Sequence, residues 1–203
     1  MAPVFPVLLM SAYLLGAIPV GVLAGRICAG VDPRESGSRN SGFTNVLRVA
    51  GKVAGILTLF GDMGKGALAV LGARVALGPS AGEWELAAGT AAVLGHMYSV
   101  FLRFKGGKGV ATALGALLAI DWAIGGGLVL VWLVSAMVWR ISSLAALIAF
   151  GTLPVWVLLF RPHGAMVAFS VGISSLIVYR HLENIQRLLA GTEPKFGLRG
   201  SKV

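Results

Sequence analysis

Hydrophobic residues run along most of the chain in long stretches that short polar segments separate. Several stretches approach the length of about 20 residues that a helix needs to cross a bilayer. They are continuous and do not alternate between polar and apolar positions, which argues against a transmembrane β-barrel. The pattern therefore predicts an all-α integral membrane protein, with spans over residues 3–25, 53–77, 84–102, 109–120, 125–139, 142–160 and 163–179.

The segment between Lys108 and Arg140 is compatible with one long span or with a tight hairpin of two short ones. Asp121 and a run of three glycines interrupt it. The two alternatives place all charges after Arg140 on opposite sides of the membrane. Only the hairpin collects nearly all lysines and arginines on one side, as the positive-inside rule expects for the cytoplasm. We therefore expect seven transmembrane helices, with the N-terminus outside and the C-terminus in the cytoplasm.

Composition supports the membrane assignment and limits the partners of the protein. Mean hydropathy is +0.85 and only 12% of residues are charged, against roughly 25% in a soluble domain. In a membrane protein, the net charge of +9 points to anionic lipid or an anionic substrate, and not to nucleic acid. The length suits a single membrane-embedded domain over residues 1–203. We expect it to be a monomer.

The first polar stretch, "ESGSRNSGFTNVLRVAGK" from Glu35 to Lys52, is rich in glycine, serine and asparagine. Glycines allow backbone conformations that bring amide groups close to a ligand. Arginine offers a planar guanidinium that suits phosphate. An ordinary solvated loop is the alternative, since these residue types are common in turns. The candidate binding residues are Ser36, Ser38, Asn40, Thr44, Asn45 and Arg48.

The second polar stretch, "FKGGKG", places Lys105 and Lys108 around Gly106 and Gly107, directly before a predicted helix. It does not match a nucleotide-binding P-loop, because Gly109 stands where a hydroxyl would bind Mg²⁺. Glycine amides and lysines before a helix start suit an anion such as phosphate. The alternative is a basic anchor at the membrane surface.

Ionisable residues also lie inside predicted spans, where such groups are rare and usually functional. Asp62 and Lys65, in "GDMGKG", are spaced i, i+3 and can pair with each other, which is the structural alternative. His96 shares a predicted helix face with Ser99 and Arg103, at i, i+3 and i+7. Its alternative role is a hydrogen bond between helices.

The tail "RHLENIQRLLAGTE" is predicted to continue the last helix beyond the membrane. Arg180, Asn184 and Arg187 share one helix face, and His181 borders it. An amphipathic helix on the membrane surface is the alternative, and it is compatible with catalysis by His181 and Asn184. The sequence contains no cluster of ligating residues that predicts a metal, and we expect no cofactor.

Five motifs follow one another along the chain, and two serines, Ser142 and Ser143, come after Arg140. The motifs are "AYLLGAIPVG", "GSRNSGFTNVLR", "GDMGKG", "GHMYSVFLRFKGGKGVATALG" and "YRHLENIQRLLAGTE". Together they resemble the PlsY-type acyl-phosphate:glycerol-3-phosphate acyltransferases. The resemblance implies a seven-helix enzyme of the bacterial cytoplasmic (inner) membrane. It would move an acyl group from acyl phosphate to the 1-hydroxyl of glycerol 3-phosphate, giving lysophosphatidic acid and phosphate.

The resemblance and the polar stretches together give a hypothesis for a site on the cytoplasmic side of the membrane. Lys105 and Lys108, with the amides of Gly106 and Gly107, are expected to hold phosphate and stabilise charge on the leaving group. The first polar stretch is expected to orient the second phosphate-bearing substrate. Arg180 is expected to bind phosphate as well.

The tail is expected to act on the attacking hydroxyl or the reacting carbonyl, through His181, Asn184 and, from another helix, Ser143. Either His181 or the donor's own phosphate would take the proton. His96, Asp62 and Lys65 are expected to support the site.

Two other functional classes stay open at the level of sequence. One is a membrane transporter of a small phosphorylated anion, with "FKGGKG" as the substrate-binding loop. An odd helix count and the lack of a visible repeat argue against it. The other is a non-catalytic scaffold that binds anionic lipid.

Overall fold

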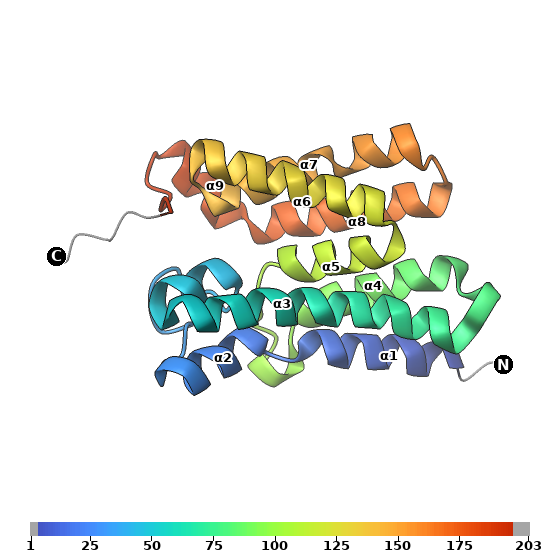
Figure 1. Ribbon diagram of the computed structural model, residues 1–203, viewed down its shortest axis with the longest axis horizontal. Helices are drawn as coiled ribbons and strands as arrows, with labels where there is room; N and C mark the ends of the chain where they lie inside the picture. The colour runs from blue at the N-terminus through green and yellow to red at the C-terminus, as the bar shows by residue number, and fades with distance from the viewer. Residues whose placement is uncertain (1–3, 197–203) are drawn as a thin grey trace. The chain divides into compact units, whose positions relative to one another are not determined.

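The computed structural model describes residues 4–196, and the chain divides into two compact units, one up to Gly125 and one from Gly126 onward. All regular elements of these residues are helical, which confirms the predicted all-α class. Residue 3 of the first predicted span and the end of the predicted cytoplasmic tail lie outside the described residues. The elements (Figure 1) are α1 (Val4–Ala17), α2 (Val20–Ala29), α3 (Phe43–Leu77), η1 (Gly78–Ser80), α4 (Gly82–Met97), η2 (Val100–Leu102), α5 (Val110–Ile120), α6 (Trp122–Trp139), α7 (Ser142–Phe160), α8 (Gly164–Arg180) and α9 (Leu182–Leu189).

The N-terminal unit is built around α3, which packs against α1, α2, α4 and α5, while α1 also packs against α4. Glycines set the spacing of these helices. A Cβ atom on Gly16 or Gly95 would overlap the backbone of the partner helix in the α1–α4 contact, and the same holds for Gly66 and Gly115 in the α3–α5 contact. Small residues let membrane helices approach closely when lipid supplies no hydrophobic driving force.

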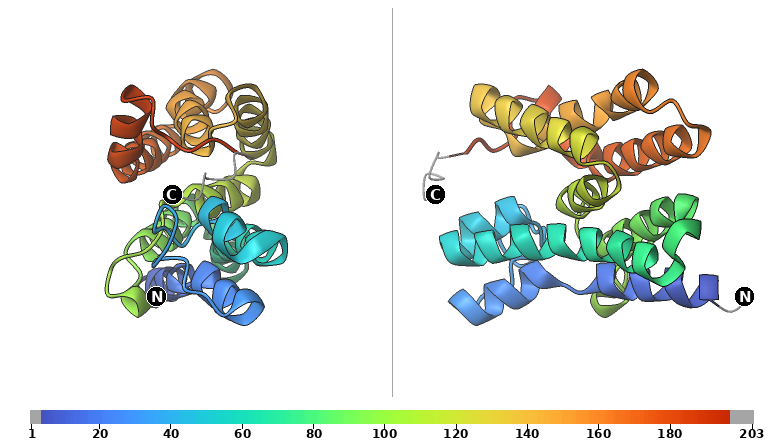
Figure 2. Two further views of the ribbon diagram at one scale, coloured as in Figure 1. Left: turned by 90° about the vertical axis from the view of Figure 1, so that its left-hand side faces the viewer. Right: turned by 45° about the vertical axis from the view of Figure 1, so that its right-hand side comes forward.

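The C-terminal unit contains the helix pair α7 and α8, drawn in orange in both views of Figure 2, and the short helix α9 that contacts α8. Phe150 and Leu153 of α7 and Ile173 and Ile177 of α8 are fully or almost fully buried. The Ser174 hydroxyl donates a hydrogen bond of 2.6 Å to the carbonyl oxygen of Phe150. Apolar packing therefore joins the pair, and one buried polar contact fixes its alignment.

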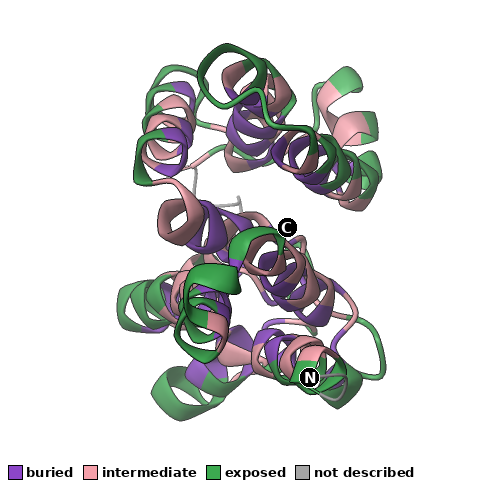
Figure 3. Ribbon diagram, turned by 90° about the vertical axis from the view of Figure 1, so that its right-hand side faces the viewer, coloured by how far each residue is buried: buried purple, intermediate pink, exposed green. Residues whose placement is uncertain are grey.

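Many large apolar side chains point outward, as expected of helices that face lipid. Val7 and Met10 of α1 are 64% and 59% exposed, and Val75 at the end of α3 is 85% exposed. Figure 3 shows exposed residues, in green, on many outer faces of the helices, whereas buried residues, in purple, line the inner ones. A soluble monomer would not leave so much apolar surface in water.

Four helical segments of the described residues are long and apolar enough to cross a membrane: Val4–Ala29, Phe43–Ser80, Trp122–Trp139 and Ser142–Phe160. A fifth is possible if Gly164–Arg180 and Leu182–Leu189, which meet at a bend of 60°, form one span. The predicted spans 84–102 and 109–120 correspond to α4 and α5, with 16 and 11 residues. Both are shorter than a full crossing requires, so the predicted count of seven spans stays a prediction.

The chain reverses between α5 and α6, at the place where the charge pattern favours two helices over one. Asp121 has extended backbone, and its Oδ1 accepts hydrogen bonds from the amides of Ala123 and Ile124 at 3.0 and 3.1 Å. It thus caps the start of α6. A Cβ on Gly125 would lie 2.5 Å from the amide nitrogen of Leu118, a proximity that one continuous helix could not give.

Candidate functional site

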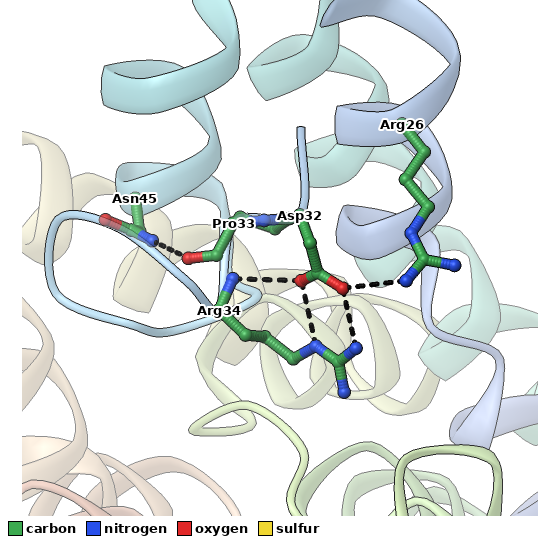
Figure 4. Close-up of polar contacts among 5 residues, drawn as sticks. All are labelled: Arg26, Asp32, Pro33, Arg34 and Asn45. Carbon is green, nitrogen blue, oxygen red and sulfur yellow. Dashed lines mark hydrogen bonds and ion pairs between the residues drawn. The ribbon is translucent and has the colours of Figure 1, made fainter. Parts of the chain in front are cut away.

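The segment between α2 and α3, residues 30–42, is called the polar loop below, and a buried carboxylate holds its first half. Asp32 accepts hydrogen bonds from Arg26 Nη2 at 3.0 Å, from Arg34 Nε at 2.9 Å and from Arg34 Nη2 at 2.6 Å (Figure 4). The amide of Arg34 adds a fourth bond at 3.0 Å. The bonds from Arg34 hold the pKa of Asp32 well below its usual range, against the opposing effect of burial.

The second half of the polar loop is organised by Asn45 at the start of α3. Its Nδ2 donates to the carbonyl oxygens of Pro33, Ser36 and Asn40 at 2.7, 3.2 and 2.9 Å, and its Oδ1 accepts from the amide of Ser38 at 2.8 Å. Asn45 is only 2% exposed. Its side chain therefore shapes the loop, and its predicted contact with substrate stays a prediction.

Other predicted binding residues in this region remain at the surface. Ser36, Ser38 and Arg48 are exposed, whereas Asn40 and Thr44 are half-buried. Asn40 Oδ1 accepts a hydrogen bond from the amide of Gly42 at 2.8 Å, so this side chain also supports the turn into α3. The loop thus presents two serines on a backbone that Asp32 and Asn45 hold in place, and Arg48 is exposed nearby in the first turns of α3.

The segment between η2 and α5, residues 103–109, is called the glycine–lysine loop. The amide of Gly106 donates to the Met97 carbonyl at 3.1 Å, and the amide of Gly107 donates to the His96 carbonyl at 3.1 Å. These carbonyls belong to the last turn of α4, whose C-terminal groups need donors. The two amides therefore cap a helix end, and their predicted contact with phosphate stays a prediction.

Gly106 and Gly107 lie so close to His96 that neither position has room for a side chain. A Cβ on Gly106 would lie 2.0 Å from the His96 carbonyl oxygen, and one on Gly107 would lie 2.1 Å from its Nε2. Arg103 and Phe104, just before them, have positive φ angles of 52° and 62°, which non-glycine residues adopt rarely. This tight turn leaves Lys105 exposed and Lys108 half-buried.

Asp62, Lys65 and His96 come together inside the N-terminal unit. Lys65 Nζ lies 2.8 Å from Asp62 Oδ1, as the i, i+3 spacing predicts, and His96 Nδ1 lies 3.5 Å from the same oxygen. The predicted helix face that His96 shares with Ser99 and Arg103 is wrong, because α4 ends at Met97 and Ser99 has extended backbone.

In the C-terminal unit, the predicted residues Ser143 and Asn184 meet on a carboxylate, Glu193. Its Oε1 accepts hydrogen bonds from Ser143 Oγ at 2.6 Å and from Asn184 Nδ2 at 2.5 Å. Its Oε2 accepts from Arg187 Nε at 2.7 Å. Burial raises the pKa of Glu193, but these hydrogen bonds and the charge of Arg187 outweigh burial and hold the pKa below its usual range.

His181 lies at the bend between α8 and α9 and is only 3% exposed. Its Nδ1 is 2.8 Å from the carbonyl oxygen of Ile177. A carbonyl oxygen only accepts, so Nδ1 carries the hydrogen and the neutral ring has its lone pair on Nε2. The imidazole is therefore held in the tautomer that a base acting through Nε2 requires. Arg180, one residue earlier, is half-buried.

The sequence-based site omits two carboxylates that the structure makes central, Asp32 and Glu193. Asp32 stands in the loop before the motif "GSRNSGFTNVLR", and Glu193 is the last residue of the motif "YRHLENIQRLLAGTE". Three basic residues, Arg26, Arg34 and Arg39, lie within eight positions of Asp32, and this charge pattern indicates that the carboxylate has arginine partners. Among residues 4–196, no group of His, Cys, Asp or Glu side chains could hold a metal ion.

Comparisons with known proteins add the family. The model of a family described as glycerol-3-phosphate acyltransferase matches residues 6–191. The chain belongs to the glycerol-3-phosphate acyltransferase family. It is 49% identical to the glycerol-3-phosphate acyltransferase of Cereibacter sphaeroides, over 94% of this chain and 89% of the relative. Identity to the Methylococcus capsulatus enzyme is 46%, over 97% and 98%. These comparisons confirm the predicted family and the predicted enzyme class, a glycerol-3-phosphate acyltransferase.

Two solved structures are similar over almost the whole chain. Both are PlsY (YgiH), an integral membrane glycerol 3-phosphate acyltransferase, and both share 40% sequence identity with this chain. The glycerol 3-phosphate form has a TM-score of 0.88 and covers 95% of this chain, with 96% of its own length matched. The lysophosphatidic acid form has a TM-score of 0.85, with 95% of each chain matched. The likeness confirms an integral membrane fold.

Proposed function

We propose that the protein transfers a fatty acyl group from acyl phosphate to the 1-hydroxyl of sn-glycerol 3-phosphate. The products are 1-acyl-glycerol 3-phosphate (lysophosphatidic acid) and phosphate, in the first acylation step of bacterial phospholipid synthesis. The observation that carries the proposal is the likeness, over 95% of the chain, to PlsY solved in a glycerol 3-phosphate form and a lysophosphatidic acid form.

The reaction is an acyl transfer with an activated donor. The oxygen of the 1-hydroxyl attacks the carbonyl carbon, a C–O bond forms, and the bond between that carbon and the phosphate oxygen breaks. Phosphate leaves with the electron pair, and the hydroxyl proton passes to a base. Because phosphate is a good leaving group, positioning and charge stabilisation are sufficient, and the proposal requires no covalent enzyme intermediate.

In the N-terminal unit, exposed and half-buried cations and hydroxyls bind the phosphate groups. Lys105 and Lys108 stabilise the negative charge of the leaving phosphate, and Arg48 supplies a planar fork for the phosphate of the acceptor. Ser36 and Ser38 add neutral hydrogen bonds on a backbone fixed by Asp32 and Asn45. Thr44 and Asn40 complete this set.

In the C-terminal unit, buried polar groups act on the hydroxyl and the carbonyl. His181 Nε2 takes the proton, since the bond from Nδ1 to Ile177 fixes the tautomer. Asn184 and Ser143 orient the reacting groups, and their positions are set by Glu193. Arg180 contributes positive charge next to this set.

We also propose one membrane-embedded acyltransferase domain, a monomer, in the bacterial inner membrane with the site facing the cytoplasm. Seven helices would cross or enter the bilayer, with the N-terminus outside and the C-terminus inside. The positive-inside distribution of the charges supports this orientation. The short helices α4 and α5 would then be partial crossings.

The test uses purified protein, glycerol 3-phosphate and palmitoyl phosphate that carries oxygen-18 in its bridging position. We expect lysophosphatidic acid, and all of the label in the released phosphate, because the acyl–oxygen bond breaks. Palmitoyl coenzyme A in place of the acyl phosphate should give little product.

Lysophosphatidic acid from the coenzyme A thioester at an equal rate would contradict the proposed donor. Label retained in palmitate would contradict acyl transfer. Intact folded protein that forms no lysophosphatidic acid with either donor would contradict the reaction as a whole.

A further inference from the structure

The steps proposed above leave one ionic cluster of the N-terminal unit without a part in the chemistry. Asp62 and Lys65 of α3 and His96 of α4, called the buried triad, expose only 2%, 4% and 7% of their side-chain surface. Burying ions in a membrane protein costs free energy unless partners compensate, and apolar residues would pack at lower cost. Its contacts indicate what the cluster does instead.

One contact leads from the triad to the break between α1 and α2. Pro19 has no amide hydrogen and interrupts the helix there, which leaves carbonyl groups in need of donors. Lys65 Nζ donates to the carbonyl oxygen of Ile18 at 3.0 Å, and the Ser99 hydroxyl donates to that of Ala17 at 2.6 Å. Lys65 of the triad, together with Ser99, therefore holds the point at which the first helical segment is interrupted.

This break is connected to the polar loop in two ways. Helix α2 runs from the break to Gly30, where the loop begins. Near the other end of the loop, Ser41 touches the start of α2 so closely that a Cβ on Gly21 would lie 1.8 Å from the Ser41 carbonyl oxygen. A shift of the chain at the break would therefore move both ends of the polar loop.

The other contact leads from the triad to the glycine–lysine loop. His96 Nδ1 faces Asp62 Oδ1 at 3.5 Å, while the opposite edge of the same ring lies against Gly107. The backbone of His96 also receives the Gly107 amide. A small cavity marks the place where both contacts meet, and it is lined by Ile18, Ser41, Asp62, Lys65, His96 and Ser99 among others.

We propose that the buried triad is a positioning unit that sets the placement of the polar loop relative to the glycine–lysine loop. It touches neither substrate. It acts by fixing the distance between the hydroxyl groups of the polar loop and the lysines of the glycine–lysine loop. The inference rests on the proposed function, because it assigns both loops to phosphate binding.

The first test replaces the ion pair with neutral groups, in the double variant Asp62→Asn/Lys65→Met. Removing both charges avoids a lone buried ion, which would unfold the protein for an unrelated reason. We expect KM for glycerol 3-phosphate to rise about 10-fold to 100-fold and kcat to change much less, because small misplacements of binding groups have effects of that size.

The matched control is Glu85→Gln. It removes another ion pair of α3, the one between Arg74 and Glu85, which lies apart from both loops. We expect an unchanged KM. If the double variant keeps the wild-type KM, or if Glu85→Gln raises KM equally, the positioning role is overturned.

The second test measures how readily trypsin cleaves each loop, and it requires no enzymatic activity. Arg39 and Lys105 are exposed trypsin sites, one in each loop. We expect faster cleavage at both in the double variant, and in His96→Gln a larger increase at Lys105 than at Arg39, since His96 packs directly against the glycine–lysine loop. Wild-type cleavage rates at both sites in both variants, at an unchanged unfolding temperature, would overturn the inference. Protein that forms no lysophosphatidic acid but shows the expected cleavage pattern would contradict the proposed function and support the positioning unit.

Discussion

The two units of the chain each use a carboxylate to organise polar groups, but they use it on different targets. In the N-terminal unit, Asp32 binds two arginines and the loop backbone, while the predicted substrate-binding serines stay exposed. In the C-terminal unit, Glu193 binds Ser143 and Asn184 themselves. The first carboxylate shapes a loop, and the second fixes the side chains that we assign to the reaction.

The two carboxylates also differ in how far water reaches them and their charged partners. Arg26 and Arg34, the partners of Asp32, are 61% and 35% exposed, so water screens these ion pairs. Glu193 is 7% exposed and combines one charged partner with two neutral ones. Damage in the C-terminal unit should therefore lower kcat, and damage in the N-terminal unit should mainly raise KM for the phosphate-bearing substrates.

The largest expected effect tests whether damage in the C-terminal unit lowers kcat. We expect His181→Ala to lower kcat about 10²-fold to 10⁴-fold, because a single positioned base contributes that much. The matched control is His163→Ala, since His163 is exposed at the start of α8. Steady-state assays of both variants give the comparison. A kcat near the wild-type value in His181→Ala would assign proton removal to the phosphate of the donor.

The next effect compares two glycines of the N-terminal unit. In Gly106→Ala the new methyl group would lie 2.0 Å from the His96 carbonyl oxygen, so the glycine–lysine loop must move. We expect kcat/KM to fall about 100-fold, the loss that misplacement by about 1 Å can cause. Gly72→Ala, where nothing lies within 4 Å, should leave kinetics unchanged and stabilise α3 slightly. Equal kinetics in both variants would show that the loop does not depend on this contact.

A smaller loss is expected for Glu193→Gln, which keeps the shape of the side chain and removes its charge. We expect kcat to fall about 10-fold, in line with other residues that orient a reacting group. Glu183→Gln is the control, because Glu183 is 88% exposed and lies 3.9 Å from Arg187. If KM rose in Glu193→Gln while kcat kept its wild-type value, the distinction between the two units would fail.

The pH dependence of the unfolding temperature gives a second measurement on Glu193→Gln. The pKa of Glu193 is lower in the folded protein than in the unfolded chain, so its ionised form stabilises the fold. This contribution is fully present above the unfolded pKa and disappears as pH falls through the folded pKa. The unfolding temperatures of the wild type and Glu193→Gln should therefore differ at neutral pH and converge in acid. A difference that does not depend on pH would exclude the carboxylate charge as its cause.

The same contrast explains which parts could be predicted from the sequence. Apolar runs gave the helices, and the i, i+3 spacing gave the Asp62–Lys65 pair, because both are local patterns. The hydrogen bonds of the Gly106 and Gly107 amides could not be predicted, because they depend on α4 ending at Met97, which no local signal at His96 or Ser99 indicates. Glu193 was missed because its contact with Ser143 joins residues 50 positions apart.

The smallest expected effect belongs to Asp32. Asp32→Asn keeps an acceptor but removes the charge that two arginines share, so the arginines remain hydrated and the polar loop loosens. Because these partners are largely exposed, we expect the free energy of unfolding to fall by about 1 kcal/mol, which chemical denaturation can measure. KM should rise severalfold and kcat should stay unchanged, with Glu35→Gln on the exposed part of the loop as the control. If Asp32→Asn lowered kcat as much as Glu193→Gln does, both carboxylates would act on reacting groups and the contrast between the units would fail.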